Sequence, residues 1–246
     1  MPQTDSLSDI RAELAPRGVL RAGINMSNFL LVTGKSEGGD PVGVSPSMAA
    51  EVARLLGVPL KLVPYPDPGA LSDAAGTDAW DIGLLGADPS RSEKTAFTAA
   101  YCEIQATYMV PPGSRLNNIA DVDQPGVKIA VNARSAYDLW LERNIRHATL
   151  VRASGLGAAF AMYLADRLDA LAGLRPGLLA DRARAPGHVV MDGSFMAVQQ
   201  AIGLARGKPA GEKFLRDFVE QAKASGLVAK FIAQHNVVGL SVAAAR

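Results

Sequence analysis

The chain has little of what redox and metal chemistry need. Only one of its 246 residues is a cysteine, Cys102, and its three histidines, His147, His188 and His235, lie far apart. A single thiol excludes an internal disulfide, and scattered imidazoles do not form the closely spaced ligand sets of zinc sites. We therefore expect no metal and no other cofactor.

The chain also lacks an excess of charge of either sign. Lys and Arg contribute 25 positive charges against 24 negative charges from Asp and Glu. Nucleic-acid binding needs a basic surface that such a balance does not provide, so we expect no nucleic-acid partner. Gly, Pro or polar residues interrupt every apolar stretch well before the roughly 20 residues that span a bilayer. The chain is not expected to be an integral membrane protein.

The first twenty residues mix acids, bases and prolines. They lack the basic start and the apolar run of a secretory leader. On the sequence as given we expect a cytoplasmic protein, and a periplasmic one if a leader was removed.

Short apolar runs alternate with helical patterns along most of the chain, and 48% of the residues are hydrophobic. This alternation predicts an α/β fold with parallel sheets covered by helices. Six predicted strands span residues 19–24, 60–63, 80–85, 127–132, 150–152 and 169–174. Helical spacing of apolar residues predicts helices over 156–164 and 214–222.

One further helix carries clear start and stop signals. Ser45 is a suitable N-cap, Pro46 suits the first helical position, and Gly57 is expected to end the helix. The apolar residues between them, Leu55 included, form one stripe.

Two turn-rich segments divide the pattern. Residues 110–114 read Val-Pro-Pro-Gly-Ser and residues 192–194 read Asp-Gly-Ser. Because Pro and Gly interrupt regular structure, these segments bracket the block with the fourth to sixth strands. We interpret residues 107–194 as an inserted second lobe. Residues 1–106 and 195–246 then form a discontinuous first lobe.

Six segments, in order, resemble those of the amino-acid-type ABC transporter solute-binding proteins. They read LRAGIN, GVSPSMAAEVARLLGVPLKLV, AWDIGLLGADPSRSEKTAFTAAY, GVKIAVNARSAYDLWL, RLDALAGL and AIGLARGKPAGEKFLRDFVEQAKASG, over about residues 18–236. The resemblance implies a two-lobed periplasmic binding protein-like fold, with two sheets, covering helices and a hinge of two crossing strands. It also implies a small-molecule ligand held between lobes that close by hinge bending, and an ABC permease as a possible partner.

The family clamps its ligand's carboxylate with an arginine after the third strand, and the matching residue is Arg91. Asp88 and Pro89 read as the N-cap and first residue of a helix, which places Arg91 in a first turn where the helix dipole disfavours a cation. A planar guanidinium can instead hold a carboxylate through two charge-assisted hydrogen bonds. The alternative is an exposed arginine that pairs with Glu93.

The resemblance assigns further first-lobe positions to the ligand. Two follow the third strand, where hydroxyl residues are common in the family, and the others supply polar contacts and an aromatic wall in the loops after the first two strands. They are Gly86, Ala87, Asn25, Asn28, Phe29 and Tyr65, and Asp88 of the same segment is a further ligand-binding candidate. Phe29 is alternatively a core residue, and Trp80 and Trp140 are expected in the core.

In the second lobe, Arg134, Ser135 and Ala136 match a Gly-Thr-Thr type turn that receives the carboxylate at a helix start. Ser135 followed by Asp138 predicts a capping box, and a helix start is a ready anion site. Ser135 alternatively only caps its helix. Arg134 places a long cation where the family has a small residue.

The family's amine-binding aspartate is absent, because Leu174 stands at that position and Arg175 follows it. An ammonium group buried there would lose its countercharge. We therefore predict a small anionic ligand that bears a carboxylate, with Arg91, Arg134 and Arg175 lining the cleft.

These residues favour a binding protein over an enzyme. We expect the solute-binding component of an ABC-type uptake system, or a ligand sensor derived from one, with no catalytic residues. One alternative is a cleft enzyme of the cyclohexadienyl dehydratase type. Asp88 is a weak catalytic candidate because capping a helix is a sufficient explanation for it, and Cys102 is weak because no base is placed beside it. Another alternative is a partner-binding module without a role in transport.

Overall fold

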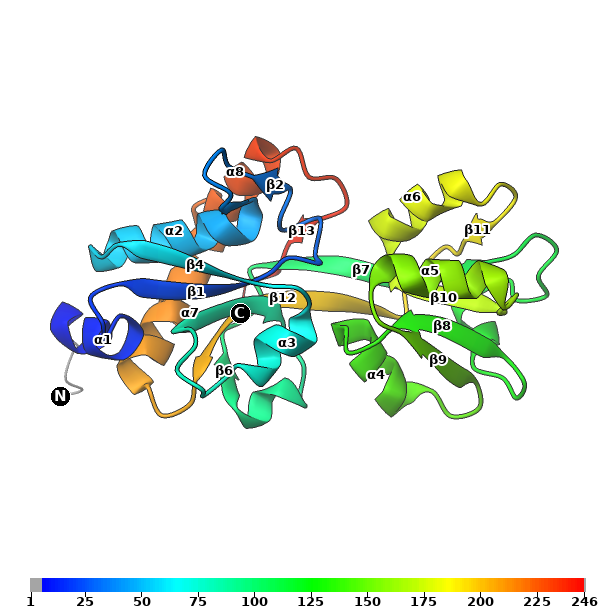
Figure 1. Ribbon diagram of the computed structural model, residues 1–246, viewed down its shortest axis with the longest axis horizontal. Coiled ribbons are helices and arrows are strands. Elements are labelled where there is room, and N and C mark those ends of the chain that lie inside the picture. Colours follow the sequence, from blue (N-terminus) through cyan, green and yellow to red (C-terminus); the bar gives the residue numbers. More distant parts are fainter. Residues whose placement is uncertain (1–5, 246) are drawn as a thin grey trace. The chain divides into compact units, whose positions relative to one another are not determined.

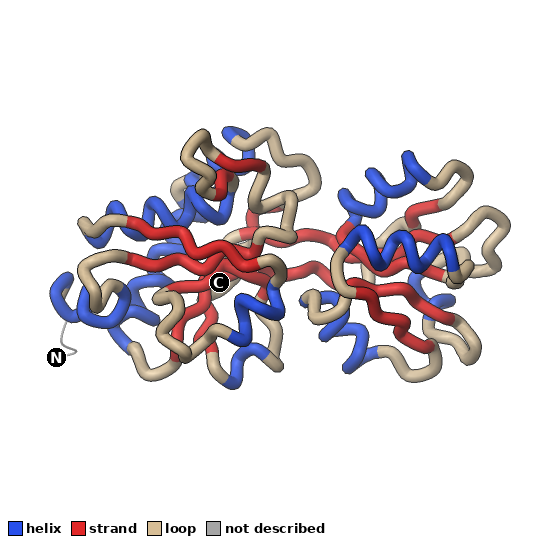
Figure 2. The backbone as a smooth tube through the Cα atoms, viewed as in Figure 1, coloured by secondary structure: helices blue, strands red, loops and turns tan. Residues whose placement is uncertain are grey.

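The computed structural model describes residues 6–245, and it divides the chain into two compact units. The first unit combines Met1–Glu103 with Gln199–Arg246, and the second is Ile104–Val198. The chain passes between the units in two long strands, β7 (Cys102–Val110) and β12 (Met196–Ala205) (Figures 1 and 2). The boundaries expected from the sequence, 106/107 and 194/195, lie within β7 and directly before β12.

The first unit is built on three parallel strands. β1 (Leu20–Asn25) lies between β4 (Leu60–Tyr65) and β5 (Ile82–Gly86), and β12 pairs with β5 in the antiparallel direction. These strands confirm the first three predicted ones, with ends shifted by one or two residues. Shorter strands complete the unit: β2 (Gly34–Lys35), β3 (Pro41–Val42), β6 (Thr95–Phe97) and β13 (Ser241–Val242).

Helices cover both sides of this sheet. In Figure 1, α2 (Val44–Leu56) and α3 (Pro68–Asp73) lie on opposite sides of β1 and β4. The other helices of the unit are α1 (Leu7–Leu14), the 3₁₀ turn η1 (Arg91–Glu93), α7 (Pro209–Ala224) and α8 (Leu227–Gln234). Across residues 6–245, no helix combines the length and the apolar character that crossing a membrane requires.

The second unit repeats the same plan. Its strands run in the order β7, β10 (Ala170–Leu174), β8 (Lys128–Asn132) and β9 (Thr149–Ala153), and the last three are parallel. Each parallel strand is followed directly by a helix: β8 by α4 (Ala136–Asn144), β9 by α5 (Leu156–Ala165) and β10 by α6 (Arg175–Arg184). The unit also contains the 3₁₀ turn η2 (Ile119–Val122) and the short strand β11 (Val189–Val190), which pairs with β7.

The start of α2 differs from the prediction. The N-cap is Gly43 rather than Ser45, and the helix begins at Val44. A Cβ atom at Gly43 would lie 2.3 Å from the carbonyl oxygen of Leu31, so close packing of the backbone sets this start. Ser45 Oγ instead lies 2.9 Å from Tyr101 Oη in the core. The predicted end is confirmed, because Gly57 is the left-handed C-cap.

Leu55 does not belong to the buried face of α2, because 40% of its surface is exposed. Trp80 is buried as predicted, whereas Trp140 is only partly buried and lies 5.5 Å from the ring of Phe195. The prediction for Trp140 is therefore only partly correct.

A buried ion pair ties β1 to the segment before β5. The guanidinium of Arg21 donates to both carboxylate oxygens of Asp81 at 3.0 and 2.7 Å, and the backbone N–H of Arg21 donates to the same carboxylate at 2.8 Å. Both side chains are more than nine-tenths buried. The hydrogen bonds to Asp81 raise the pKa of Arg21 above its ordinary value although burial opposes this.

Removal of this countercharge should destabilise the first unit strongly. In Asp81→Asn the buried guanidinium of Arg21 loses its main ionic partner, and we expect the free energy of unfolding to fall by about 3–5 kcal/mol. Urea denaturation measures the change. Asp78→Asn is the matched control, because exposed Asp78 contacts the same guanidinium and should matter far less. Equal losses in the two variants would contradict the prediction.

Candidate functional site

The first candidate residues lie in the loop after β1. Asn25 Oδ1 accepts hydrogen bonds from the N–H and hydroxyl of Ser27, and Asn28 Oδ1 accepts one from the N–H of Leu30. Both asparagines are more than nine-tenths buried. Because their carbonyl oxygens shape the loop, the amide NH₂ groups are the parts with donors to offer a ligand.

The two aromatic candidates of the first unit have different environments. Phe29 is 41% exposed, so its alternative assignment to the core is wrong. Tyr65 ends β4 and packs against a cluster that contains Leu71 and Trp80. Burial raises the pKa of Tyr65, although Arg21 opposes this. Phe29 is therefore the more accessible aromatic surface near the carboxyl edge of the sheet.

The segment after β5 forms a tight turn rather than the predicted helix start. The Asp88 carboxylate accepts hydrogen bonds from the N–H and hydroxyl of Ser90 at 2.9 and 2.7 Å. Only one 3₁₀ turn, η1, follows. The prediction that Asp88 caps an α-helix is therefore wrong. A turn of three residues has no macrodipole large enough to matter, so the argument from helix charge does not apply to Arg91.

Arg91 is buried, with only 5% of its surface exposed, which contradicts the alternative of an exposed arginine. Its Nη1 donates to the carbonyl oxygen of Gly86 at 2.5 Å. The N–H of Ala87 donates to the carbonyl oxygen of Gln199 at 2.7 Å and fixes the turn against β12. These contacts hold a planar group with five donors at the carboxyl end of β5.

A polar residue of β12 lies at the same edge and was not among the candidates. Gln200 pairs with Gly86 and is only 3% exposed. Its Oε1 is buried and has no hydrogen-bond partner within residues 6–245. Two adjacent glutamines, Gln199 and Gln200, in an otherwise apolar strand are the sequence signal that could have identified it. Buried polar atoms without partners are rare and mark sites that ligands or water complete.

In the second unit, the candidate turn joins β8 to α4. Ser135 is the N-cap of α4, and its Oγ accepts a hydrogen bond from the N–H of Asp138 at 3.1 Å. In a complete capping box the Asp138 carboxylate would accept a hydrogen bond from the backbone N–H of Ser135, and this half of the prediction is wrong. The Asp138 carboxylate accepts from the N–H of Arg134 at 2.7 Å, and its second oxygen accepts from Arg152 Nε at 2.8 Å.

The first turn of α4 is rich in hydrogen-bond donors. Asn132 Oδ1 accepts from the N–H of Gly155 at 2.9 Å, and Ser135 Oγ accepts from Asp138 as described. The amide nitrogen of Asn132 and the hydroxyl hydrogen of Ser135 are thus the groups with capacity to donate. Ala136 begins the helix and is buried. The turn is suited to an acceptor such as a carboxylate.

Tyr137 adds a hydroxyl to this turn, and sequence reasoning missed it. The residue is 3% exposed, and its Oη has no hydrogen-bond partner within the part of the chain that the structure describes. Ser135 and Asn132 lie near enough to oppose the rise of its pKa, but burial is the larger effect and raises that pKa. The phenol therefore stays neutral and can donate a proton in a hydrogen bond.

Leu174 ends β10 as the N-cap of α6, and Arg175 begins that helix. Arg175 Nε donates to Gln105 Oε1 at 2.9 Å, its Nη1 donates to the carbonyl oxygen of Met191 at 3.0 Å, and its Nη2 donates to that of Gly193. The guanidinium thus connects α6 to β7 and to the segment before β12. These bonds give Arg175 a structural role. Of the three arginines predicted to bind the ligand, Arg175 is therefore the weakest candidate.

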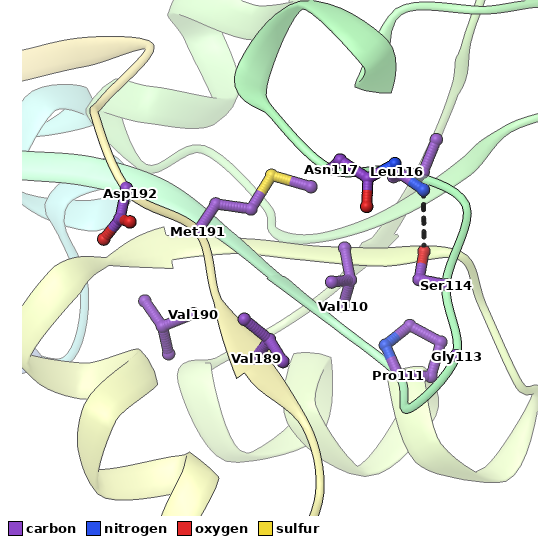
Figure 3. Close-up of a pocket in the computed structure, with 10 residues that line it drawn as sticks. All are labelled: Val110, Pro111, Gly113, Ser114, Leu116, Asn117, Val189, Val190, Met191 and Asp192. Atoms are coloured by element: carbon purple, nitrogen blue, oxygen red, sulfur yellow. Dashed lines mark hydrogen bonds between the residues drawn. The ribbon is translucent and has the colours of Figure 1, made fainter.

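The pocket in Figure 3 lies elsewhere in the second unit. It has a volume of about 210 Å³ and lies between the loop after β7 and the segment around β11. Its walls include Val110, Leu116, Val190 and Met191. None of the candidate residues lines it.

Cys102 is buried and has a pKa raised well above its ordinary value by that burial, which disfavours the reactive thiolate. No group of three or more His, Cys, Asp or Glu residues within 6–245 is arranged to hold a metal ion.

Two α/β units joined by two long strands, each with loops and helix starts at the carboxyl edge of parallel strands, define the class of two-lobed binding proteins. The chain matches the family model of bacterial extracellular solute-binding proteins, family 3, over residues 20–237, and it belongs to that family. No sequence among the curated proteins matches it.

Solved structures show the same fold at low sequence identity. A mutant of ArgBP from T. maritima is 24% identical with a TM-score of 0.73, covering 93% of this chain and 99% of its own. A Streptococcus pneumoniae amino acid ABC transporter substrate-binding protein bound to L-arginine is 17% identical with a TM-score of 0.74, covering 96% and 99%. An ancestral amino acid-binding protein, a precursor of cyclohexadienyl dehydratase, is 23% identical with a TM-score of 0.72, covering 93% and 97%.

The unpartnered hydroxyl of Tyr137 leads to a prediction for the ligand-free protein. Because Tyr137→Phe removes a buried group that forms no hydrogen bond with residues 6–245, the free energy of unfolding should stay within about 1 kcal/mol of the parent or rise. Urea denaturation measures it. Tyr163→Phe is the matched control, since Tyr163 Oη is also buried and has no partner among the described residues, in the hydrophobic core of the same unit. A larger loss for Tyr137→Phe alone would show that its hydroxyl is bonded in the free protein.

The bonds of Arg175 predict a structural effect. Arg175→Ala should lower the free energy of unfolding by about 1–3 kcal/mol, because it removes hydrogen bonds from a charged donor to oxygens of β7 and the 191–193 segment. Arg182→Ala, an exposed arginine on the same helix, is the control and should change little. Equal stability of the two variants, measured by thermal and urea denaturation, would contradict the structural role.

Proposed function

We propose that the chain binds a small carboxylate-bearing solute, with Arg91 holding the carboxylate. The observation that carries the proposal is the buried guanidinium of Arg91 at the carboxyl end of β5, anchored through Gly86. The planar guanidinium of an arginine matches the two oxygens of a carboxylate through paired, charge-assisted hydrogen bonds. The protein then acts as the solute-binding component of an amino-acid-type ABC uptake system, with a permease as partner, or as a sensor derived from one.

The second unit supports the same class of ligand. Asn132, Ser135 and Tyr137 bring donors to the start of α4, and the first backbone N–H groups of any α-helix have no partner within the helix. Each unit therefore presents donors for an anionic group.

The solved relative bound to L-arginine favours an amino acid as the ligand. Leu174 argues against an ammonium group at the family's usual position, because a leucine side chain offers no countercharge. We therefore propose that acids without an α-ammonium bind more tightly than their amino acid counterparts. A comparison of succinate and butyrate with L-glutamate and L-arginine tests this preference directly.

Ligand-induced thermal stabilisation measures the role of Arg91. A ligand at one hundred times its dissociation constant stabilises the folded state by about 2.7 kcal/mol, or roughly 5–10 °C for a chain of this size. We expect at least one of the four acids to stabilise the parent in this way. Arg91→Gln should abolish the shift, and Arg91→Lys should retain only part of it, because lysine keeps the charge but not the planar fork.

Arg54→Ala is the matched control for Arg91, since it removes an exposed arginine of the same unit that pairs with Glu51. This variant should keep the full ligand-induced shift. A shift that Arg91→Gln retains would contradict the assignment of the carboxylate to Arg91. A stronger shift with L-glutamate than with succinate would contradict the preference inferred from Leu174.

A further inference from the structure

The short strand β13 lies along the start of β7 (Figure 1). Its two residues pair in antiparallel register with Cys102 and Glu103. The N–H of Ala243 extends this ladder by donating to the carbonyl oxygen of Tyr101 at 3.2 Å. We call residues 240–244 the strap. The strap pairs with β7 just where the chain leaves the first unit, whose first segment ends at Glu103.

Side chains also hold the strap to the first unit. Leu240 and Ala243 are more than nine-tenths buried, whereas the two residues of β13 between them are exposed. Lys223 Nζ of α7 donates to the carbonyl oxygen of Ala244 at 2.8 Å and to Glu220 Oε1 at 2.8 Å. The Lys223 side chain is only 3% exposed. Its buried ammonium therefore anchors the strap through a charge-assisted hydrogen bond.

The first residues of β7 are thus held on both edges. The N–H of Tyr101 donates to the carbonyl oxygen of Gln200 in β12 at 2.9 Å, and its own carbonyl oxygen accepts from the strap. Tyr101 Oη lies 2.9 Å from Ser45 Oγ of α2, and the whole side chain is buried. A strand with partners on both edges moves less freely than one with a free edge, because local mobility follows from few contacts.

We propose that the strap is a detachable brace, which confines the bending of β7 to residues beyond Glu103. It detaches while the first unit stays folded, because a two-residue strand with exposed side chains has a low free energy of local opening. Two-lobed proteins of this fold move by bending at the strands that join their lobes. The strap therefore sets how readily this chain bends at β7.

Cys102 is a built-in reporter for detachment. It is the only cysteine of the chain, it is fully buried, and it pairs with the strap. The rate of maleimide labelling is measured at several urea concentrations below the unfolding transition. Detachment exposes little surface, so the rate should be nearly independent of urea. Labelling through global unfolding would instead rise with the full urea dependence of that transition.

Two variants weaken the strap by independent routes. Ala243→Pro removes the N–H that bonds to Tyr101, and Lys223→Met removes the ammonium that bonds to Ala244 but keeps an apolar side chain. Each should raise the labelling rate about tenfold. Lys213→Met is the matched control, because it removes an exposed lysine of the same helix, and it should leave the rate unchanged.

Single-molecule energy transfer measures the bending itself. In a chain with Cys102→Ala, dyes are attached at the exposed positions Lys61→Cys in the first unit and Arg182→Cys in the second. Ala243→Pro and Lys223→Met should widen the distribution of transfer efficiencies in the ligand-free protein, and the control should not.

Three results would overturn the inference. Parent labelling with the full urea dependence of global unfolding would show that the strap does not detach by itself. Unchanged transfer distributions in both strap variants would show that it does not restrain β7. Loss of the folded state in both variants would make the strap an integral part of the first unit. Neither readout needs a ligand, so the result is independent of the proposed function.

Discussion

Parallel pairing of strands is the constraint on which the candidate site depends. When neighbouring strands run in one direction, the loops that follow them gather at one edge of the sheet. In the first unit this brings the segments after β1, β4 and β5 together, and in the second unit it does so for the starts of α4, α5 and α6. The buried pair of Arg21 and Asp81 helps to hold β1 and β5 in that arrangement.

At these edges, the two units use their polar groups differently. The first unit places one guanidinium, that of Arg91, in a buried position and holds it through a carbonyl oxygen. The second unit combines neutral donors with the exposed charge of Arg134. Arg175 also follows a strand in the sequence, but its guanidinium donates hydrogen bonds to Gln105 and Met191 of its own unit. The chemistry of the site therefore follows from where each guanidinium is held rather than from the number of arginines.

The sequence predicts the parallel strands well because each is a short apolar run followed by a helical pattern. The residue patterns alone did not predict β7 and β12. In β7, polar side chains such as Glu103 and Gln105 interrupt the apolar run, and the burial pattern changes along the strand. Within the site, the capping role of Ser135 follows from local sequence. The burial of Arg91, the left-handed φ of Arg134 and the bonds of Arg175 depend on segments distant in the sequence or on turn geometry, which residue patterns do not encode.

A crystal structure of the chain with bound succinate tests the central claim most directly. The account predicts that one carboxylate accepts hydrogen bonds from the guanidinium of Arg91, at the donor–acceptor distances of about 2.7–2.9 Å typical of charged pairs. A ligand bound away from the carboxyl end of β5, with no contact to Arg91, would contradict it.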